Sequence, residues 1–179
     1  MVAPASPTTL TLGGSSSSGT ANPTILNIDN PYKFRVYLSG AQTITNGTFT
    51  TLQFNTKSYD TNTNFNTSNY TYTVPISGIY HFDCWVSQDA PVPDIRCLVR
   101  LRKNGSDTTI FDTIQTGDST TNKFLVGGSD TILLTSGDVM LLDYYQSTGA
   151  SKTVNVIGTM FSGYLVCPTT ATALTFNLS

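Results

Sequence analysis

The stretch "YTVPISGIYHF", residues 72–82, holds two short runs that favour strands, YTV and IYHF. Pro75 and Gly78 interrupt these runs within four residues. A proline cannot donate a hydrogen bond to a sheet ladder, and a glycine weakens one, so the stretch cannot form one central strand. We therefore predict two strands joined by a tight corner.

The composition of the whole chain favours a β structure as well. The chain has 179 residues, which is near the size of one ordinary domain. Charged residues make up 11% of it, whereas an average soluble domain has about 25%. In their place stand 31 Thr, 18 Ser and 13 Asn, residues that suit half-exposed strands and turns. The sequence predicts an all-β protein with a neutral, hydroxyl-rich surface.

The net charge and the apolar runs exclude several classes of partner. The formal net charge is −2, so no overall basic field recruits nucleic acid or an acidic membrane. No stretch approaches the roughly 18 apolar residues that a membrane span needs. The N-terminal sequence MVAPASPTTLTLGG lacks the basic start and the apolar run of a signal peptide. We expect neither membrane insertion nor export through the usual secretory route, and release by cell lysis stays open.

Three cysteines, Cys84, Cys97 and Cys167, cannot all pair within one chain. Their spacing contains no CxxC and no nearby histidine pair, so it does not match a metal motif. We expect reduced, buried thiols that behave as small hydrophobic residues and form no disulfide.

Strand-like runs recur at short intervals from Tyr32 onward, separated by Gly, Asn, Asp, Ser and Pro. The predicted strands cover residues 32–39, 49–54, 69–74, 78–86, 95–103, 108–114, 122–126, 131–134, 138–146, 152–158 and 160–166. This spacing predicts a sandwich or a barrel rather than alternating strands and helices.

The run IRCLVRLRK (95–103) is typical of a strand with one buried and one solvated face. Its apolar residues alternate with its arginines: Cys97, Val99 and Leu101 against Arg96, Arg100 and Arg102. The dipeptide Asn104-Gly105 follows directly, and it is the strongest short-range signal for a hairpin.

Two other predicted strands, 78–86 and 138–146, are largely apolar on both faces. An antiparallel strand of this kind needs a second cover beyond its own sandwich core, and a homo-oligomer interface provides one. With one residue of the final strand, the side chains that we assign to this interface are His81, Trp85, Met140, Leu142, Tyr144 and Tyr164.

Four motifs stand in order along the chain: YTVPISGIYHF, CLVRLRKNG, SGDVMLL and FSGYLV. In this order they resemble the globular domain of the C1q/TNF-like family. The family pattern runs from a Pro-x-x-Gly corner through an L-x-K-N-G hairpin and a G-D-x-V turn to a final F-S-G-[FY]-L strand. The resemblance covers roughly residues 32–166, and FNTKSYDTNTNFN (54–66) resembles the loop before the corner in bacterial and phage-encoded members.

This resemblance implies a ten-stranded antiparallel jelly-roll sandwich that assembles as a homotrimeric knob around a threefold axis. Pro75 and Gly78 then turn the chain between two strands, with Gly78 supplying backbone freedom. Asn104-Gly105 and Gly137-Asp138 are the other turn positions of the pattern. The corner in the opening stretch is therefore expected to be structural and not a catalytic loop.

The chain departs from the secreted animal members of the family in two places. It has no collagen-type Gly-X-Y stalk, and it continues past the usual last strand with CPTTATALTFNLS (167–179). We divide it into an N-terminal arm (1–31), a C1q/TNF-like domain (32–167) and a C-terminal tail (168–179). The short arm, the extra tail and the Thr/Ser/Asn bias suit a virion appendage better than a circulating animal protein.

Residues 1–31 have the composition of a linker. The segment GGSSSSGT (13–20) is typical of flexible spacers, and prolines on both sides of it discourage regular structure. Two apolar pieces, TLTL (9–12) and TILNI (24–28), have the alternation of strands that add to an exposed sheet edge. We predict a docking arm for a capsid or tail protein, with contacts through Leu10, Leu12, Ile25, Leu26 and Ile28.

The sequence offers little support for catalysis. His81 is the single histidine, and no GxSxG, HExxH or P-loop motif occurs. We expect a packed or interface histidine, no enzyme activity and no cofactor.

Two polar clusters have competing interpretations. Asp60, Asn62, Asn64 and Asn66 alternate as in calcium loops, but the Gly and the terminal Glu of an EF-hand loop are missing, so we favour a plain turn over a metal site. A basic stripe could meet a phosphate or an acidic glycan, but a solvated strand face is the simpler interpretation. The stripe consists of Arg96, Arg100, Arg102 and Lys103.

Two classes of function stay open on the sequence alone. The first is a structural and adhesive virion protein: a trimeric knob on the virion surface, docked by its arm on a phage capsid or tail and able to contact a host-surface glycan or protein. The second is a secreted or spore-surface ligand that binds a receptor or a polysaccharide from an extracellular or cell-surface location. Neighbouring portal or capsid genes would favour the first class, and a neighbouring collagen-like gene product would favour the second.

Overall fold

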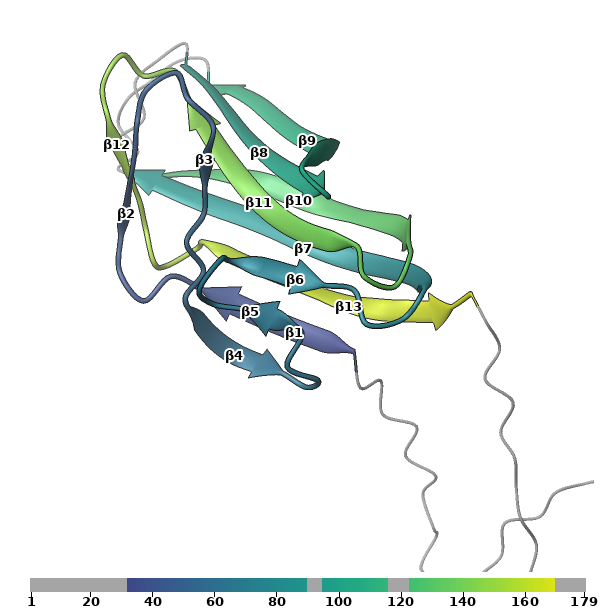
Figure 1. The fold of residues 1–179 in the computed structure, drawn as a ribbon. Coiled ribbons are helices and arrows are strands. Elements are labelled where there is room, and N and C mark those ends of the chain that lie inside the picture. The colour runs from purple at the N-terminus through teal and green to yellow at the C-terminus, as the bar shows by residue number, and fades with distance from the viewer. Residues whose placement is uncertain (1–31, 90–94, 116–122, 170–179) are drawn as a thin grey trace, which may run out of the picture.

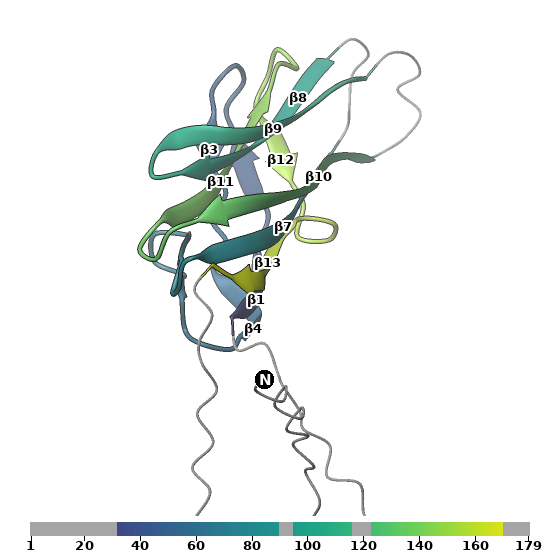
Figure 2. The same ribbon diagram turned by 90° about the vertical axis from the view of Figure 1, so that its right-hand side faces the viewer.

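The computed structural model describes residues 32–89, 95–115 and 123–169. Within these ranges the chain forms strands and turns and no helix. Two antiparallel sheets lie face to face with the core between them (Figure 1, Figure 2). The prediction of an all-β antiparallel sandwich is confirmed.

Each sheet combines strands from distant parts of the chain. The seven-stranded sheet has the order β2 (Gln42–Ile44), β12 (Lys152–Val154), β7 (Gly78–Asp89), β13 (Met160–Pro168), β1 (Lys33–Tyr37) and β4 (Thr56–Asp60), with β10 (Lys123–Leu134) also paired with β7. The six-stranded sheet has the order β5 (Phe65–Asn66), β6 (Thr71–Thr73), β11 (Val139–Gln146), β8 (Ile95–Lys103) and β9 (Ser106–Gln115), with β3 (Thr50–Thr51) paired with β11.

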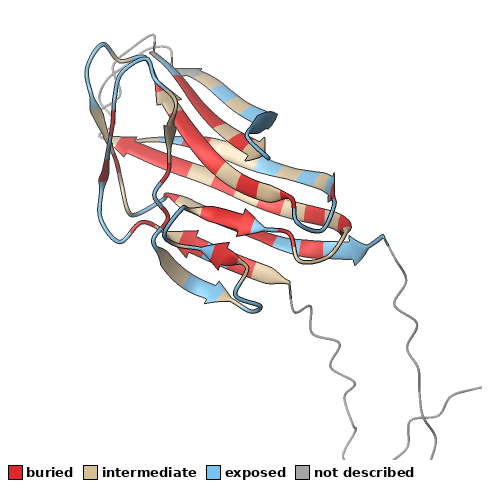
Figure 3. Ribbon diagram, viewed as in Figure 1, coloured by how far each residue is buried: buried red, intermediate tan, exposed pale blue. Residues whose placement is uncertain are grey.

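An aromatic cluster joins the two sheets at the centre of the core. Strand alternation turns every second side chain inward, which Figure 3 shows as buried bands along the strands. Phe34 of β1 stacks on Tyr72 of β6 with 4.3 Å between ring centroids and meets Phe161 of β13 edge-on at 5.0 Å. Stacked and edge-to-face pairs of this kind add to the stabilisation that burial of the rings already supplies.

The corner of the opening stretch lies between β6 and β7. Gly78 begins β7, where β13 runs alongside it. A Cβ at Gly78 would lie 2.6 Å from the carbonyl oxygen of Cys167 and 2.6 Å from Leu165 Cδ1. The glycine is therefore required by the close approach of β13 and not by a left-handed backbone, which corrects the expectation of backbone freedom.

The three turn motifs of the sequence meet at one end of the sandwich. Asn104 and Gly105, with φ of 51° and 81°, form the two-residue hairpin between β8 and β9. Asn104 Nδ2 donates to Asp138 Oδ1 at 2.7 Å. The Val74 N–H donates to the Asp138 carbonyl at 2.8 Å, and the Gly137 N–H donates to the Val74 carbonyl at 2.8 Å. The corner, the hairpin and the Gly-Asp turn therefore hold one another in place.

The predicted strands 122–126 and 131–134 are one continuous strand, β10. Gly127 and Gly128 look like a break in the sequence, but they pair with β7. A Cβ at Gly127 would lie 1.9 Å from the carbonyl oxygen of Cys84, so the glycine permits the close approach of β10 to β7.

Three short strands were not predicted: β2, β4 and β5. Two of them, β4 and β5, lie inside the segment 54–66 that we expected to be a loop. They bring the described strands to thirteen instead of ten, without changing the two-sheet architecture.

The cysteines form no disulfide, and they differ in exposure. Cys84 and Cys97 are buried as expected, whereas Cys167 is exposed near the end of β13. Burial raises the pKa of the Cys84 and Cys97 thiols above their ordinary value. The expectation of burial is wrong for Cys167 alone.

The strand pairings define two ends of the molecule. We call the basal end the one where Lys33 of β1 pairs with Tyr164 and where Gly78 of β7 pairs with Pro168. The distal end lies beyond the pairing of Trp85 with Met160. The predicted docking arm (1–31) and most of the predicted tail (170–179) lie outside the described residues.

Candidate functional site

The outward face of the seven-stranded sheet, here the outer face, is the candidate interaction surface. Most of the large apolar side chains that are strongly exposed lie on this face or on the loop beside it. They are Tyr59, Leu125, Leu133, Ile157, Tyr164 and Val166, whereas Ile110 lies on the other sheet. Contiguous exposed apolar surface is uncommon on a monomeric protein and marks an interaction site.

Three of these side chains gather at the basal end, and together with the half-buried Ile79 of β7 we call them the basal patch. The patch consists of Ile79, Leu133, Tyr164 and Val166, and Leu133 stands directly opposite Ile79 in the sheet. Tyr164 is 44% and Leu133 is 64% exposed. The patch therefore presents an apolar surface that no described part of the chain covers.

His81 borders the basal patch on the same face of β7. Its ring centroid lies 5.2 Å from that of Tyr164. Its Nδ1 lies 3.0 Å from Thr131 Oγ1, and its Nε2 lies 3.4 Å from Asp83 Oδ1. The predicted interface residues His81 and Tyr164 thus lie together on the outer face, and Trp85 lies further along the same strand.

Three other residues that we assigned to the interface are elsewhere. Met140, Leu142 and Tyr144 of β11 have no exposed surface in the single chain. They belong to the core between the sheets, and the Tyr144 hydroxyl donates to Gln88 Oε1 at 3.0 Å. A side chain with no exposed surface has none to bury against a second copy, so the assignment of these three residues is corrected.

The chain itself supplies the second cover that β11 requires. Phe49, just before β3, packs on Tyr145 on the outward side of β11, with 5.2 Å between ring centroids. The Arg100 guanidinium lies 3.8 Å from the centroid of the Phe49 ring, in a cation–π contact. The outer side of β11 is therefore packed within one chain, unlike the outer face of β7 and β13.

A hollow of about 560 Å³ lies on the outer face toward the distal end, and we call it the distal hollow. The loop at residues 156–159 forms one side of it. Its other lining includes Arg35, Tyr37, Ser58, Trp85, Leu125 and Met160. Trp85 was singled out from the sequence, whereas Arg35 and Tyr37 were missed. The sequence feature that could have indicated them is the alternation in KFRVY. Lys33, Arg35 and Tyr37 lie on the face opposite to that of the buried Phe34 and Val36.

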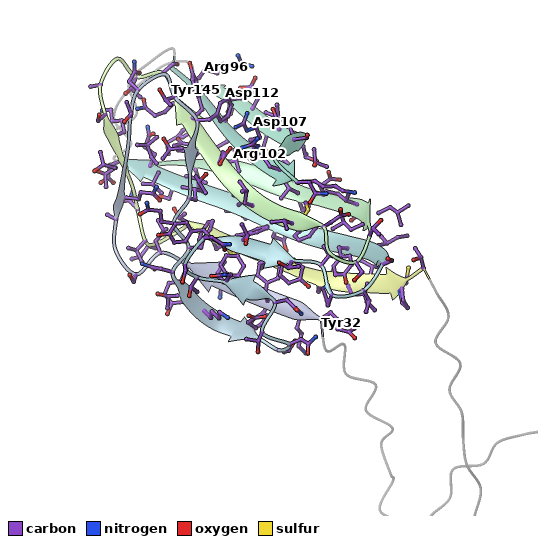
Figure 4. All side chains as sticks on the ribbon, viewed as in Figure 1. Tyr32, Arg96, Arg102, Asp107, Asp112 and Tyr145 are labelled. Atoms are coloured by element: carbon purple, nitrogen blue, oxygen red, sulfur yellow. The ribbon has the colours of Figure 1, made fainter. Side chains whose placement is uncertain are left out.

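Aspartates neutralise the basic stripe of β8. Arg96 donates to both oxygens of Asp112, the shortest distance being 2.7 Å. These bonds hold the pKa of Asp112 below its usual range. Arg100 and Arg102 both donate to Asp143 Oδ2, at 2.6 and 3.2 Å. Figure 4 labels Arg96, Asp112 and Arg102 on the six-stranded sheet.

The fourth cation of the stripe is also paired. Lys103 Nζ lies 2.8 Å from Asp138 Oδ2. Burial raises the pKa of Asp138, but hydrogen bonds from Lys103, the Thr135 N–H and Asn104 outweigh it and leave this pKa below its usual value. The stripe is thus an ion-pair ladder, which does not favour it as a phosphate or glycan site.

The Asp60 segment is built as a turn. Asp60 accepts hydrogen bonds from the Asn64 N–H at 3.1 Å and from the Phe65 N–H at 3.0 Å. Lys57 Nζ lies 2.7 Å from Asp60 Oδ2. These donors occupy the carboxylate that a calcium ion would need, so the geometry favours the turn interpretation.

The described residues include neither a cluster of metal-ligating type nor a membrane-spanning helix. No cluster of three or more His, Cys, Asp or Glu within them has the geometry to hold a metal ion. Over the same residues, no helix is long and apolar enough to cross a membrane. His81 lies on a sheet face and does not line the distal hollow.

Comparisons with known proteins agree with this geometry. A sequence model of the C1q domain matches residues 33–166. The globular domain of the zebrafish complement 1qA protein is 18% identical, with a TM-score of 0.54, over 76% of this chain and 98% of that chain. The Eiger TNF of S. frugiperda is 8% identical, with a TM-score of 0.60, over 84% of this chain and all of that chain (100%). A search of curated protein sequences found no match.

A third similar structure is murine APRIL at pH 5.0, which is 10% identical with a TM-score of 0.56, over 75% of this chain and 98% of that chain. Identities this low show the shared fold and nothing more. The match to the C1q domain covers most of the chain, and the chain belongs to the C1q domain family. The resemblance stated from the four sequence motifs is confirmed, as is the jelly-roll fold that it implied.

Proposed function

We propose that this C1q-domain chain is a non-enzymatic structural and adhesive protein that acts as a homotrimeric knob, with its subunits in contact through the basal patch. The observation that carries the proposal is the exposed apolar surface of Leu133, Tyr164 and Val166 at one end of the outer face. Obligate interfaces resemble a domain core cut in half, and an apolar sheet face supplies such a surface. His81 and Trp85 flank this contact on β7.

The basal position of the patch suits a knob that stands on a support. β1 begins and β13 ends at the basal end, because Lys33 pairs with Tyr164. The arm (1–31) therefore joins the domain beside the proposed subunit contact, and three arms enter the trimer at one end. The loop at residues 156–159 then lies at the end away from the support.

We propose a phage virion as the setting, with the arm docked on a capsid or tail protein. The support for this is compositional: a hydroxyl-rich surface of low charge and a Ser/Gly spacer in the arm. The alternative, a secreted or spore-surface ligand, uses the same trimer without docking on a particle. Attachment to particles therefore separates the two settings.

The trimer is tested by the oligomeric state of Tyr164→Asp. Tyr164 is 44% exposed in the single chain, so the variant is expected to fold and to fail to trimerise, since an unpaired charge would be buried in the contact. Ile110→Asp is the matched control, because Ile110 is 49% exposed on the other sheet. Light scattering should give a trimer for wild type and Ile110→Asp and a monomer for Tyr164→Asp. A stable Tyr164→Asp trimer would contradict the proposed contact.

The setting is tested by deleting residues 1–31. We expect a soluble trimer that no longer decorates virions in electron micrographs, because the docking segment is gone. If the shortened knob still attaches at wild-type occupancy, attachment lies elsewhere and the tail from Pro168 to Ser179 becomes the next candidate.

A further inference from the structure

A second hollow of the domain, of about 440 Å³, is formed by β5, by the turns on either side of it and by β6, and we call it the lateral hollow. β5 is the edge strand of the six-stranded sheet (Figure 1). Tyr72 and Val74 are buried in the core, so strand alternation turns Thr73 of β6 outward, where it is exposed. The lateral hollow therefore lies on the sheet that does not carry the basal patch, and the proposed subunit contact leaves it open.

The lining of the lateral hollow is polar but contains no ionisable side chain. It consists of Thr63, Asn64, Phe65, Asn66, Thr67 and Thr73. The threonine hydroxyls and the side-chain amide of Asn64 form no hydrogen bond within the described residues. Asn66 Oδ1 accepts a hydrogen bond from the Ser68 N–H at 2.8 Å, and its amide nitrogen stays free to donate. Several unengaged donors and acceptors therefore face one small volume.

The backbone around the lateral hollow is held in place before any ligand binds. The Thr73 N–H donates to the Asn64 carbonyl at 2.9 Å, which ties the turn before β5 to β6. Thr63 has a φ of 56°, a left-handed conformation that is sterically unfavourable for a β-branched residue. Strained residues of this kind persist where the surrounding structure holds them, and they gather at ligand-binding sites. A preformed hollow also reduces the loss of conformational entropy on binding.

We propose that the lateral hollow binds a neutral hexose unit, whose hydroxyl groups exchange hydrogen bonds with Asn64, Asn66 and Thr73. A sugar hydroxyl both donates and accepts, so it matches amide and hydroxyl side chains, whereas a charged ligand would lose hydration and find no opposite charge in the lining. Lys57, the nearby cation, is already paired with Asp60. A volume of about 440 Å³ falls within the usual range of small-ligand sites. This inference rests on the proposed function only for the source of the sugar, a neutral polysaccharide on a host surface.

The ligand class is tested on the full-length protein by saturation-transfer difference NMR. The neutral probes are methyl α-glucoside, methyl α-galactoside and methyl α-mannoside, and glucuronate is the charged comparison. We expect saturable binding of at least one neutral sugar with about millimolar affinity, because a ligand of so few atoms makes few contacts, and no binding of glucuronate. Binding of no neutral sugar, equal binding of glucuronate, or binding of an uncharged peptide in place of the sugar would overturn the proposal.

The position of the site is tested with variants of its lining. Asn64→Ala should weaken binding about three- to tenfold, because it removes hydrogen bonds to a neutral ligand, and Thr73→Arg should abolish binding by filling the hollow. Asn62→Ala is the matched control, since Asn62 is exposed two positions away and does not line the hollow. It should bind as wild type does. Unchanged binding by Asn64→Ala and Thr73→Arg would overturn the site.

The source of the sugar and the role of the trimer are separated by two further measurements. Tighter binding of a polymer than of the single sugar indicates a surface polysaccharide, because three hollows of one trimer bind together, and equal binding per ring indicates a free sugar. The lateral hollow lies within one chain, so monomeric Tyr164→Asp should bind the single sugar as wild type does. A monomeric wild type that binds the sugar would overturn the trimer alone, whereas a trimer that binds no neutral sugar would overturn the lateral site alone.

Discussion

Asp143 is the side chain on which the ion-pair ladder of β8 and β11 depends. Its side chain is 4% exposed, and its carboxylate accepts hydrogen bonds from Arg100, Arg102 and the Thr51 hydroxyl, the last at 2.8 Å. Arg100 is 15% exposed and also covers the Phe49 ring. Asp143→Asn keeps the shape of the side chain and removes the charge that compensates two partly buried guanidinium groups.

Breaking a buried ion pair by removing one partner costs about 3–5 kcal/mol, and the partial exposure of the arginines places Asp143→Asn near the lower limit, about 3 kcal/mol. For a domain of this size, this loss corresponds to a fall in the melting temperature of about 10 °C. The assay is thermal unfolding followed by circular dichroism at one fixed protein concentration, because a trimer makes the midpoint concentration-dependent.

Asp112→Asn is the matched control, since it makes the same substitution on the partner of Arg96, which is the exposed pair of the ladder. An exposed pair contributes little, so its midpoint should stay close to that of wild type. Added salt should not reproduce the Asp143→Asn loss in wild type, because burial protects that pair from screening. If Asp143→Asn and Asp112→Asn have the same melting temperature, the ladder is only a solvated charge pattern. The proposed stabilising role of Asp143 is then wrong.

The close contact at Gly78, the three thiols and the Asp138 carboxylate can each be tested directly. Gly78→Ala should cost about 1–3 kcal/mol in urea unfolding, because its Cβ would meet the Cys167 carbonyl oxygen, whereas Gly40→Ala should be tolerated because nothing lies within 4 Å. Cys167 should react rapidly with iodoacetamide in the native protein, whereas Cys84 and Cys97 should react only after denaturation. An intact mass lower by two protons per chain would contradict the reduced state. The depressed pKa of Asp138 contributes stability above its unfolded pKa of about 3.9 that is lost as the pH falls through the folded value. The gap in melting temperature between wild type and Asp138→Asn should therefore be constant from about pH 7 to 5 and shrink below about pH 4; a constant gap throughout would refute this origin.

The sequence predicts the parts of the fold that depend on short-range chemistry. The hairpin turn at Asn104-Gly105 requires positive φ at two successive positions. Few dipeptides other than Asn-Gly adopt this conformation at a low cost in free energy. The alternation of Cys97, Val99 and Leu101 with arginines predicts which face of β8 is buried. The continuity of β10 could not be predicted from the sequence. Gly127 is typical of a break between strands, and the reason for a glycine there is the close carbonyl of Cys84 on the neighbouring strand, which the sequence does not show.

The candidate site shows a different limit of sequence reasoning. The apolar character of a side chain predicts that it is buried, but it does not predict which part of the protein buries it. β11 and β7 are both apolar on two faces, and for both we expected a second copy as the cover. The structure separates them: the outward side of β11 is packed under Phe49 and Arg100, while the outward side of β7 and β13 leaves Tyr164 and Val166 exposed. Arg100 accounts for this difference between β11 and β7. An arginine that is hydrogen-bonded to Asp143 and stacked on an aromatic ring can cover an apolar strand within its own chain. No comparable arrangement lies over Tyr164 in the described part of the chain, and this is why the subunit contact is proposed there.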